Sequence, residues 1–136
     1  MRLPLLVVDA ANVVGSVPDG WWRDRAGATT RLRDNLVGVA EHGLPSLPGP
    51  LEVVLVVEGK ARHVAPVPGV RVVPATGDGD DEVVAVVRAE GADRPVAVAT
   101  ADRALRLRVE ALGAAVVGPR SVRWRVPRRT RPFCCR

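Results

Sequence analysis

The sequence predicts an α/β domain in which a parallel sheet is covered by helices. Short apolar runs rich in Val alternate with longer helical stretches, an order typical of right-handed crossovers between parallel strands. Hydrophobic residues make up 47% of the 136 residues, enough for one buried core. Aromatic residues make up only 3%, so the core must consist of small aliphatic side chains. That composition favours strands that are buried on both faces.

The amino-terminal half is expected to form two strands and one long helix. Residues 3–8 are a continuous apolar run and predict a buried first strand. In residues 24–41, apolar side chains recur every three or four positions, which predicts a helix with one buried face. The Pro-rich stretch 44–50 is expected to be a loop, and residues 51–57 the second strand.

The carboxyl-terminal half repeats the alternation of strand and helix. The expected elements are a strand at 70–73, an acidic turn at 76–80, a helix at 81–89, a strand at 95–99, a helix at 101–112 and a strand at 114–117. After residue 118 the composition changes abruptly to Arg, Pro and Trp. We therefore divide the chain into a domain at 1–118 and a tail at 119–136.

The net charge of +5 arises from the tail alone. Residues 119–136 hold seven Arg and no acid, so the first 118 residues carry 13 basic and 15 acidic groups, a net of −2. A basic tail suits a polyanion, because each phosphate contact releases counterions. Contact with nucleic acid, contact with an acidic partner and a merely solvated end all remain open.

The cysteines and apolar runs indicate the compartment. Cys134 and Cys135 are adjacent and lack metal-ligand spacing, so a reduced, cytoplasmic protein is expected. The apolar run at 3–8 is too short to span a membrane, and no membrane partner is expected. The sequence is compatible with a homodimer but does not set the oligomeric state.

Nearly every predicted strand is followed by a carboxylate. Asp9 follows the first strand, Glu58 the second, residues 78–82 the third and Asp102 the fourth. Ligands of parallel α/β sheets bind beyond the carboxyl ends of the strands, near the switch in strand order. These acids are therefore expected to share one edge of the sheet.

Clustered carboxylates repel one another unless a cation lies between them. Hard divalent cations such as Mg²⁺ or Mn²⁺ take oxygen ligands and also bind substrate phosphates. No His or Cys is expected at this edge, which argues against zinc. A metal of this kind orients and activates water, and hydrolysis of a phosphodiester is the reaction that fits.

Three short motifs carry a resemblance to a known family. Residues 7–15, Val-Val-Asp-Ala-Ala-Asn-Val-Val-Gly, resemble the opening of NYN domains of the YacP-like group, whose usual form is Asp-Gly-Tyr-Asn. Residues 79–84, Gly-Asp-Asp-Glu-Val-Val, resemble the acidic turn of that group. Residues 100–104, Thr-Ala-Asp-Arg-Ala, resemble its element after the fourth strand. The resemblance covers about residues 3–118.

This resemblance implies a three-layer PIN-like fold, with a central parallel sheet of order 3-2-1-4-5 flanked by helices. It implies a metal-dependent endoribonuclease that uses Mg²⁺ or Mn²⁺ and acts on RNA. Asp9 and Asp102 would then face each other across neighbouring strands, and Asn12 would orient Asp9 or contact a phosphate. The implied catalytic acids are Asp9, Asp80 and Asp102, and the implied metal ligands are Asp9, Asp80, Asp81 and Asp102.

Each acid also has a purely structural explanation. Asp80 and Asp81 can cap the following helix and complement its dipole, and Asp102 can do the same for the next one. A cap needs fewer acids than this turn holds, which favours a site. Glu58 lies at the correct edge, but its strand is farther from the switch point, so we leave it outside the expected site.

Aromatic and basic residues precede the first long helix. Trp21 and Trp22 can stack on unpaired bases, although aromatics at this position more often staple the helix to the core. Arg23 and Arg25 are expected to bind substrate along the RNA backbone, with a solvated helix face as the alternative.

Two other functions are alternatives to the ribonuclease. One is an RNA-binding or regulatory module with the same fold. The carboxylate cluster argues against it, because such a module needs none, whereas Ala10 and Ala11 in place of the usual Gly-Tyr keep it open. A haloacid-dehalogenase-type phosphatase is disfavoured, because Asp9 is not followed by the Asp-x-Asp pattern that such enzymes need.

Overall fold

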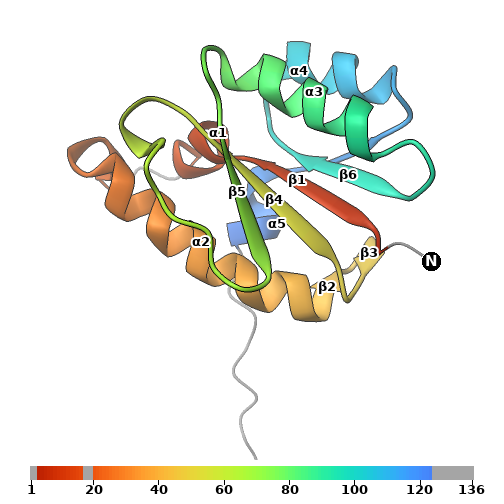
Figure 1. Cartoon of the computed structure of the whole chain (residues 1–136), viewed down its shortest axis with the longest axis horizontal. Helices are drawn as coiled ribbons and strands as arrows, with labels where there is room; N and C mark the ends of the chain where they lie inside the picture. Colours follow the sequence, from red (N-terminus) through yellow and green to blue (C-terminus); the bar gives the residue numbers. More distant parts are fainter. Residues whose placement is uncertain (1–2, 17–19, 124–136) are drawn as a thin grey trace, which may run out of the picture.

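The computed structural model describes residues 3–16 and 20–123 and shows a five-stranded parallel sheet (Figure 1). The strand order is β5-β4-β1-β6-β7, and all four neighbouring pairs are parallel. This confirms the expected order 3-2-1-4-5. The strands are β1 (Leu5–Asp9), β4 (Glu52–Val57), β5 (Val70–Pro74), β6 (Val96–Ala99) and β7 (Ala115–Val117).

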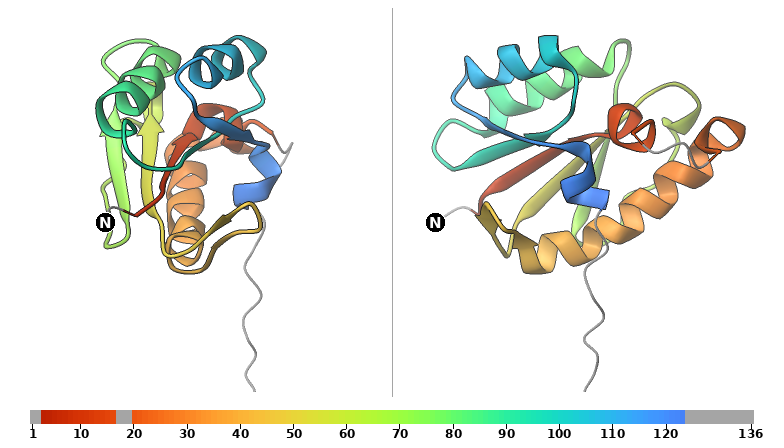
Figure 2. Two further views of the ribbon diagram at one scale, coloured as in Figure 1. Left: turned by 90° about the vertical axis from the view of Figure 1, so that its right-hand side faces the viewer. Right: turned by 180° about the vertical axis from the view of Figure 1, so that it is seen from behind.

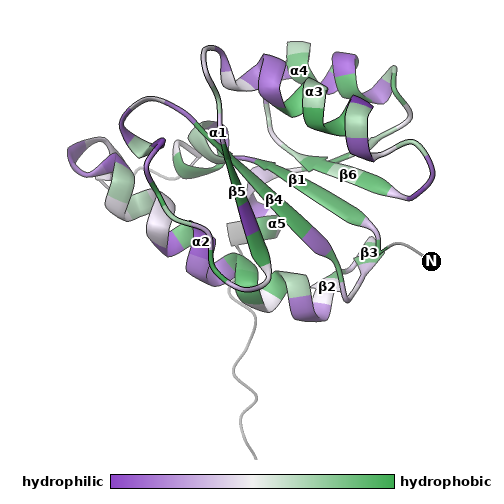
Figure 3. Ribbon diagram, viewed as in Figure 1, coloured by the Kyte–Doolittle hydropathy of each residue, from purple (hydrophilic) through white to green (hydrophobic). Residues whose placement is uncertain are grey.

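Helices cover both faces of the sheet, so the expected three-layer α/β fold is confirmed (Figure 2). Side chains alternate along each strand. Leu6 and Val8 of β1 therefore pack towards α1, α2 and α5, while Leu5 and Val7 pack towards α3 and α4. Figure 3 shows the strands as the hydrophobic middle layer. The helices are α1 (Ala10–Val14), α2 (Arg25–His42), α3 (Gly79–Glu90), α4 (Arg103–Glu110) and α5 (Pro119–Arg123).

Several short elements were not foreseen from the sequence. Helix α1 begins directly after β1, and 3-10 turns occupy Trp21–Arg23 and Gly59–Ala61. The stretch expected as a loop at 44–50 includes most of a small antiparallel hairpin, β2 (Gly43–Leu44) and β3 (Leu47–Pro48). Gly43 makes this hairpin possible, because its φ is 81° and a Cβ there would collide with the backbone of residues 48 and 49.

An aspartate caps the start of each long helix. Asp24 accepts a hydrogen bond from the Gly27 amide (2.9 Å), and Asp78 accepts one from the Asp80 amide (3.0 Å). Asp102 caps α4 in the same way. These caps set the helix starts, which therefore differ by one or two residues from the expected ones.

The first residues of the predicted tail pack on the domain. Residues 119–123 form α5, in which Val122 is fully buried, and the Asn35 amide nitrogen on α2 donates a hydrogen bond to the Val122 carbonyl (2.8 Å). The remaining tail, with Cys134 and Cys135, lies outside the described residues, as do the contacts predicted for it. Among the described helices, none is both long and apolar enough to cross a bilayer.

An ion-pair network ties the amino ends of the central strands together. Arg94 is 1% exposed at its side chain and donates hydrogen bonds to the Leu3 carbonyl (3.0 Å) and to Glu52 (2.6 Å). Arg71 on β5 donates to Glu52 (2.8 Å) and to Glu90 at the end of α3. Acids and guanidinium groups are therefore matched at this end of the sheet.

Because α5 buries Val122, we expect Val122→Ala to lower the free energy of unfolding by about 1–3 kcal/mol through lost burial and a residual cavity. The matched control is Val37→Ala, which removes the same two methyl groups from an exposed position on α2. Urea denaturation of both variants measures the difference. Equal stability of the two variants would show that residues 119–123 do not pack on the domain.

Candidate active site

Asp9 occupies the carboxyl end of the central strand, where it is 4% exposed. It follows Leu5 and Val7 in the two-residue alternation, so its side chain lies on the face covered by α3 and α4. Because Val8 pairs with Ala99 on β6, Asp9 lies level with Thr100. The Thr100 hydroxyl donates a hydrogen bond to Oδ2 of Asp9 (3.3 Å).

Glu58 follows β4 on the same face of the sheet. Val56 pairs with Asp9, and the extended backbone of Glu58 (φ −148°, ψ 169°) continues the alternation. A Cβ on Gly79 would collide with Oε2 of Glu58, so this carboxylate lies against the first residue of α3. Glu58 is therefore a member of the site that the sequence pattern does not include, although its alternation with Val54 and Val56 points to this face.

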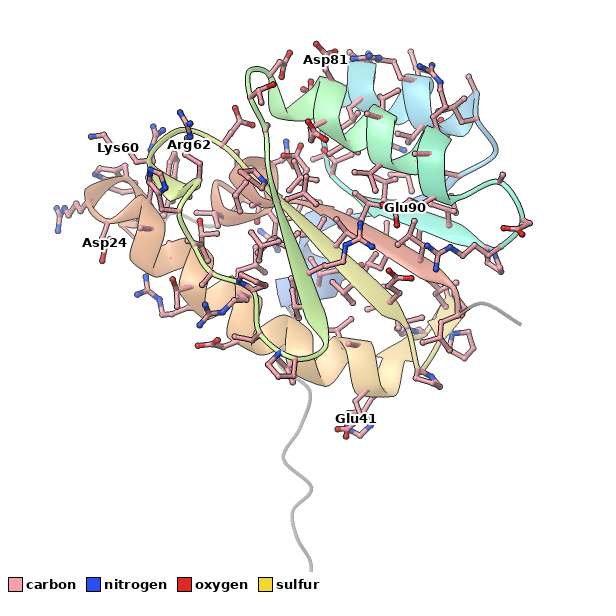
Figure 4. The ribbon with its side chains drawn as sticks, viewed as in Figure 1. Asp24, Glu41, Lys60, Arg62, Asp81 and Glu90 are labelled. Atoms are coloured by element: carbon pink, nitrogen blue, oxygen red, sulfur yellow. The ribbon has the colours of Figure 1, made fainter. Side chains whose placement is uncertain are left out.

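The acidic turn before α3 divides its carboxylates between different partners. Asp78 makes the helix cap, which leaves the side chain of Asp80 available for other contacts. Asp80 is half-buried, and its charge interacts with Asp102 and Glu58. Asp81 is 70% exposed at its side chain and pairs with Arg108 on α4 (3.0 Å), on the outer side of α3 (Figure 4).

The loop after β6 holds Asp102 in a fixed position. Its Oδ1 accepts a hydrogen bond from the Leu105 amide (3.0 Å), and its own amide donates to the Thr100 hydroxyl (3.1 Å). Oδ1 of Asn12, on α1, accepts a hydrogen bond from the Ala101 amide (2.7 Å). Asp102 is therefore a helix cap as well as a member of the site, and Asn12 anchors the loop that carries it.

Burial and mutual repulsion raise the pKa values of Asp9 and Asp80. Burial raises the pKa of Asp9 to about 6, and the charges of Asp80 and Glu58 act in the same direction. The Asn12 backbone amide and the Thr100 hydroxyl oppose this pKa shift. Burial followed by the charges of Asp102, Asp78 and Glu58 raises the pKa of Asp80, while Arg108 lowers it.

We call Asp9, Glu58, Asp80 and Asp102 the acid cluster. Oxygen donors of like charge suit a hard divalent cation, which would relieve their repulsion. Within residues 3–16 and 20–123, however, no three acidic, His or Cys side chains already converge as a metal site. The oxygen donors and negative charge of the cluster fit Mg²⁺ or Mn²⁺. The acids would nevertheless have to move closer together to bind either ion.

A pocket of about 190 Å³ adjoins the acid cluster and shares Glu58 with it. Trp21 forms part of its wall and packs against the core, with the Arg25 guanidinium 5.3 Å from its ring centroid. Trp22 is 53% exposed, and Arg23 lies 5.9 Å from its ring centroid. The pocket is lined by Ala10, Ala11, Val14, Trp21, Arg25, Thr29, Glu58, Gly59 and Ala61.

Two solved structures of Rae1 (YacP) from Bacillus subtilis are similar to this chain. One has a TM-score of 0.71 at 17% identity and covers 87% of this chain and 70% of Rae1. The other, a W164L mutant, has a TM-score of 0.66 at 18% identity and covers 90% and 72%. No protein-family model and no curated protein sequence matches the chain. The chain thus shares its fold with YacP, and this is the fold that the three motifs imply.

The raised pKa of Asp9 has a consequence for stability. The stability associated with protonated Asp9 is present below its ordinary pKa of 3.8 and is lost as the pH rises through about 6. Without divalent cations, Asp9→Asn should therefore gain up to roughly 3 kcal/mol over the wild type between about pH 4 and pH 7.5.

Urea denaturation in EDTA across that pH range tests this prediction. Glu41→Gln is the control, because Glu41 is an exposed acid at the far end of α2 (Figure 4). A stability difference between Asp9→Asn and the wild type that stays constant with pH would contradict the prediction.

Proposed function

We propose that this chain is a metal-dependent endoribonuclease that hydrolyses RNA phosphodiesters at the acid cluster. The observation that carries the proposal is the burial of Asp9 near the charges of Asp80 and Glu58, with Asp102 acting in turn on Asp80, at the carboxyl edge of the sheet. Burial of like charges opposes folding, and a bound cation would relieve that repulsion, so the cluster is expected to serve cation binding. The fold shared with YacP, together with the three motifs, supports RNA cleavage as the purpose of that cation.

Asp9, Asp80 and Asp102 are the proposed metal-holding and catalytic acids, with Glu58 as a fourth carboxylate. Asp81, which the motif also offered as a ligand, is left out of the proposed set because it pairs with Arg108. Mg²⁺ or Mn²⁺ held by these acids would supply positive charge for the phosphate and would lower the pKa of a water molecule.

The chain's own residues position the reacting groups. Thr100 contacts both Asp9 and the Asp102 amide, so it holds the two acids in a fixed relation across β1 and β6. Asn12 holds the 101–102 loop through the Ala101 amide, which makes it a positioning residue rather than a phosphate ligand in this proposal. Such support behind ligands is what keeps a site preorganised.

RNA is the proposed substrate partly on electrostatic grounds. Arg25 lines the pocket that adjoins the acid cluster, and both Arg25 and Arg23, two residues before it, are exposed. Their guanidinium groups can bind backbone phosphates without reading sequence. They would offset the repulsion between a polyanion and an acidic site.

A catalytically silent RNA-binding module is the second candidate. The observation that favours it is that the described acids do not already converge as a metal site. The substitution of Gly-Tyr by Ala10 and Ala11 points the same way. This module would bind RNA with a strong dependence on salt and would leave it intact.

Labelled RNA incubated with the protein and Mg²⁺ or Mn²⁺ should be cleaved. We expect Asp9→Asn, Asp80→Asn and Asp102→Asn each to slow cleavage on the order of 100-fold or more, because even partners behind metal ligands cost about 10–100-fold. Asparagine keeps the shape of each side chain and still caps α4 at position 102. Gel analysis of the products gives the rates.

Asp81→Asn is the matched control, since it removes the adjacent charge from the same turn. It should retain the wild-type rate, because Asp81 pairs with Arg108 outside the cluster. Cleavage that survives both Asp9→Asn and Asp102→Asn would refute the site. Salt-sensitive binding by a wild type that never cleaves would favour the silent module.

Metal binding is tested independently of turnover. A cation that binds only the folded protein raises its free energy of unfolding by about 2.7 kcal/mol at a concentration 100 times the Kd. Mn²⁺ should therefore raise the thermal midpoint of the wild type and of Asp81→Asn, and EDTA should reverse the rise. Asp80→Asn should show a much smaller rise, and an equal response of all three proteins would contradict the proposed ligand set.

A further inference from the structure

The pocket beside the acid cluster has the size for one small chemical group. Its volume is about 190 Å³, whereas pockets for drug-sized ligands usually measure about 300–1,000 Å³. It lies where α1, α2 and the turn after β4 meet, and Glu58 belongs to both the pocket and the acid cluster. A group bound there would be adjacent to whatever the acid cluster binds.

The walls of the pocket favour a flat aromatic ligand. The Trp21 indole is held by its contacts with the core, and Arg25 lies 5.3 Å from its ring centroid. Aromatic and guanidinium groups are the usual stacking partners of unpaired nucleobases. Trp22 contacts Trp21 edge-on, with ring centroids 5.9 Å apart, but is not part of the lining.

A residue of the acid cluster borders the pocket. Glu58 is part of the lining, while its carboxylate lies against Gly79 at the start of α3. The pocket and the acid cluster are therefore neighbours at the carboxyl edge of the sheet.

The side chains of α1 leave this space open. Ala10 and Ala11 both line the pocket, and Ala11 is exposed at its rim. A large side chain at position 11 would fill the space without disturbing the core. The pocket therefore exists because small residues follow Asp9.

We propose that this pocket receives one unpaired nucleobase of an RNA strand, next to the phosphate addressed by the acid cluster. The inference rests on the proposed function for its substrate, and it names the substrate class as RNA with an unpaired base at the cleavage site. Duplex RNA does not satisfy this requirement, because its bases are paired and stacked.

Binding of fluorescein-labelled single-stranded RNA to the full chain in EDTA, followed by fluorescence anisotropy, tests the pocket without turnover. We expect Ala11→Tyr and Trp21→Ala to weaken binding about tenfold or more, in line with the loss of one base–aromatic stack. Trp22→Ala is the matched control and should bind as the wild type does. Thermal unfolding checks that each variant is folded.

RNA with one base removed at successive positions sharpens the test. At one position the abasic RNA should bind the wild type as weakly as intact RNA binds Ala11→Tyr, and the two losses should not add. The same strand annealed to its complement should bind the wild type and Ala11→Tyr equally. Intact affinity in Ala11→Tyr, or equal losses at every abasic position, would overturn the pocket.

The cleavage assay separates this inference from the proposed function. If RNA is cleaved but Ala11→Tyr binds and cleaves as the wild type does, the pocket is wrong and the nuclease stands. If base-dependent binding occurs without cleavage in Mg²⁺ or Mn²⁺, the nuclease is wrong and the pocket stands. A wild type that neither binds nor cleaves RNA overturns both.

Discussion

The placement of Asp9 at the buried end of the central strand is the constraint on which the site depends. Because β1 lies between β4 and β6, a side chain at its carboxyl end meets residues from both neighbours, Glu58 and Thr100. Helix α3 crosses the same edge and brings Asp80. The charges that act on Asp9 from these elements are of its own sign, so the fold gathers groups that oppose one another.

The acids at the two ends of the sheet have opposite kinds of partners. At the amino end, Glu52 and Glu90 are paired with Arg71 and Arg94 in a partly buried network. At the carboxyl end, the described partners of Asp9 are a hydroxyl, a backbone amide and other acids. The ion pairs at the amino end therefore hold the strands together. At the carboxyl end the like charges repel one another, and unfavourable interactions of this kind are typical of functional sites.

The acid cluster and the adjoining pocket share one residue. Glu58 belongs to the acid cluster because it continues the alternation of β4, and it also lines the pocket together with Trp21 and Arg25. The small side chains of α1 keep that pocket open directly after Asp9. The proposed phosphate and base sites would thus be neighbours at one edge of the sheet.

The sequence by itself determined the five strands of the parallel sheet, their order and the edge that carries the acids. Apolar runs and strand-end carboxylates are local patterns, and the motifs supplied the order. Only the tertiary structure decided that Asp80 faces the cluster while Asp81 faces Arg108, that Asp78 makes the cap, and that Glu58 joins the site. Those outcomes depend on the rotation of α3 above the sheet and on its packing against α4. Such contacts join residues far apart in the chain, so no local pattern specifies them.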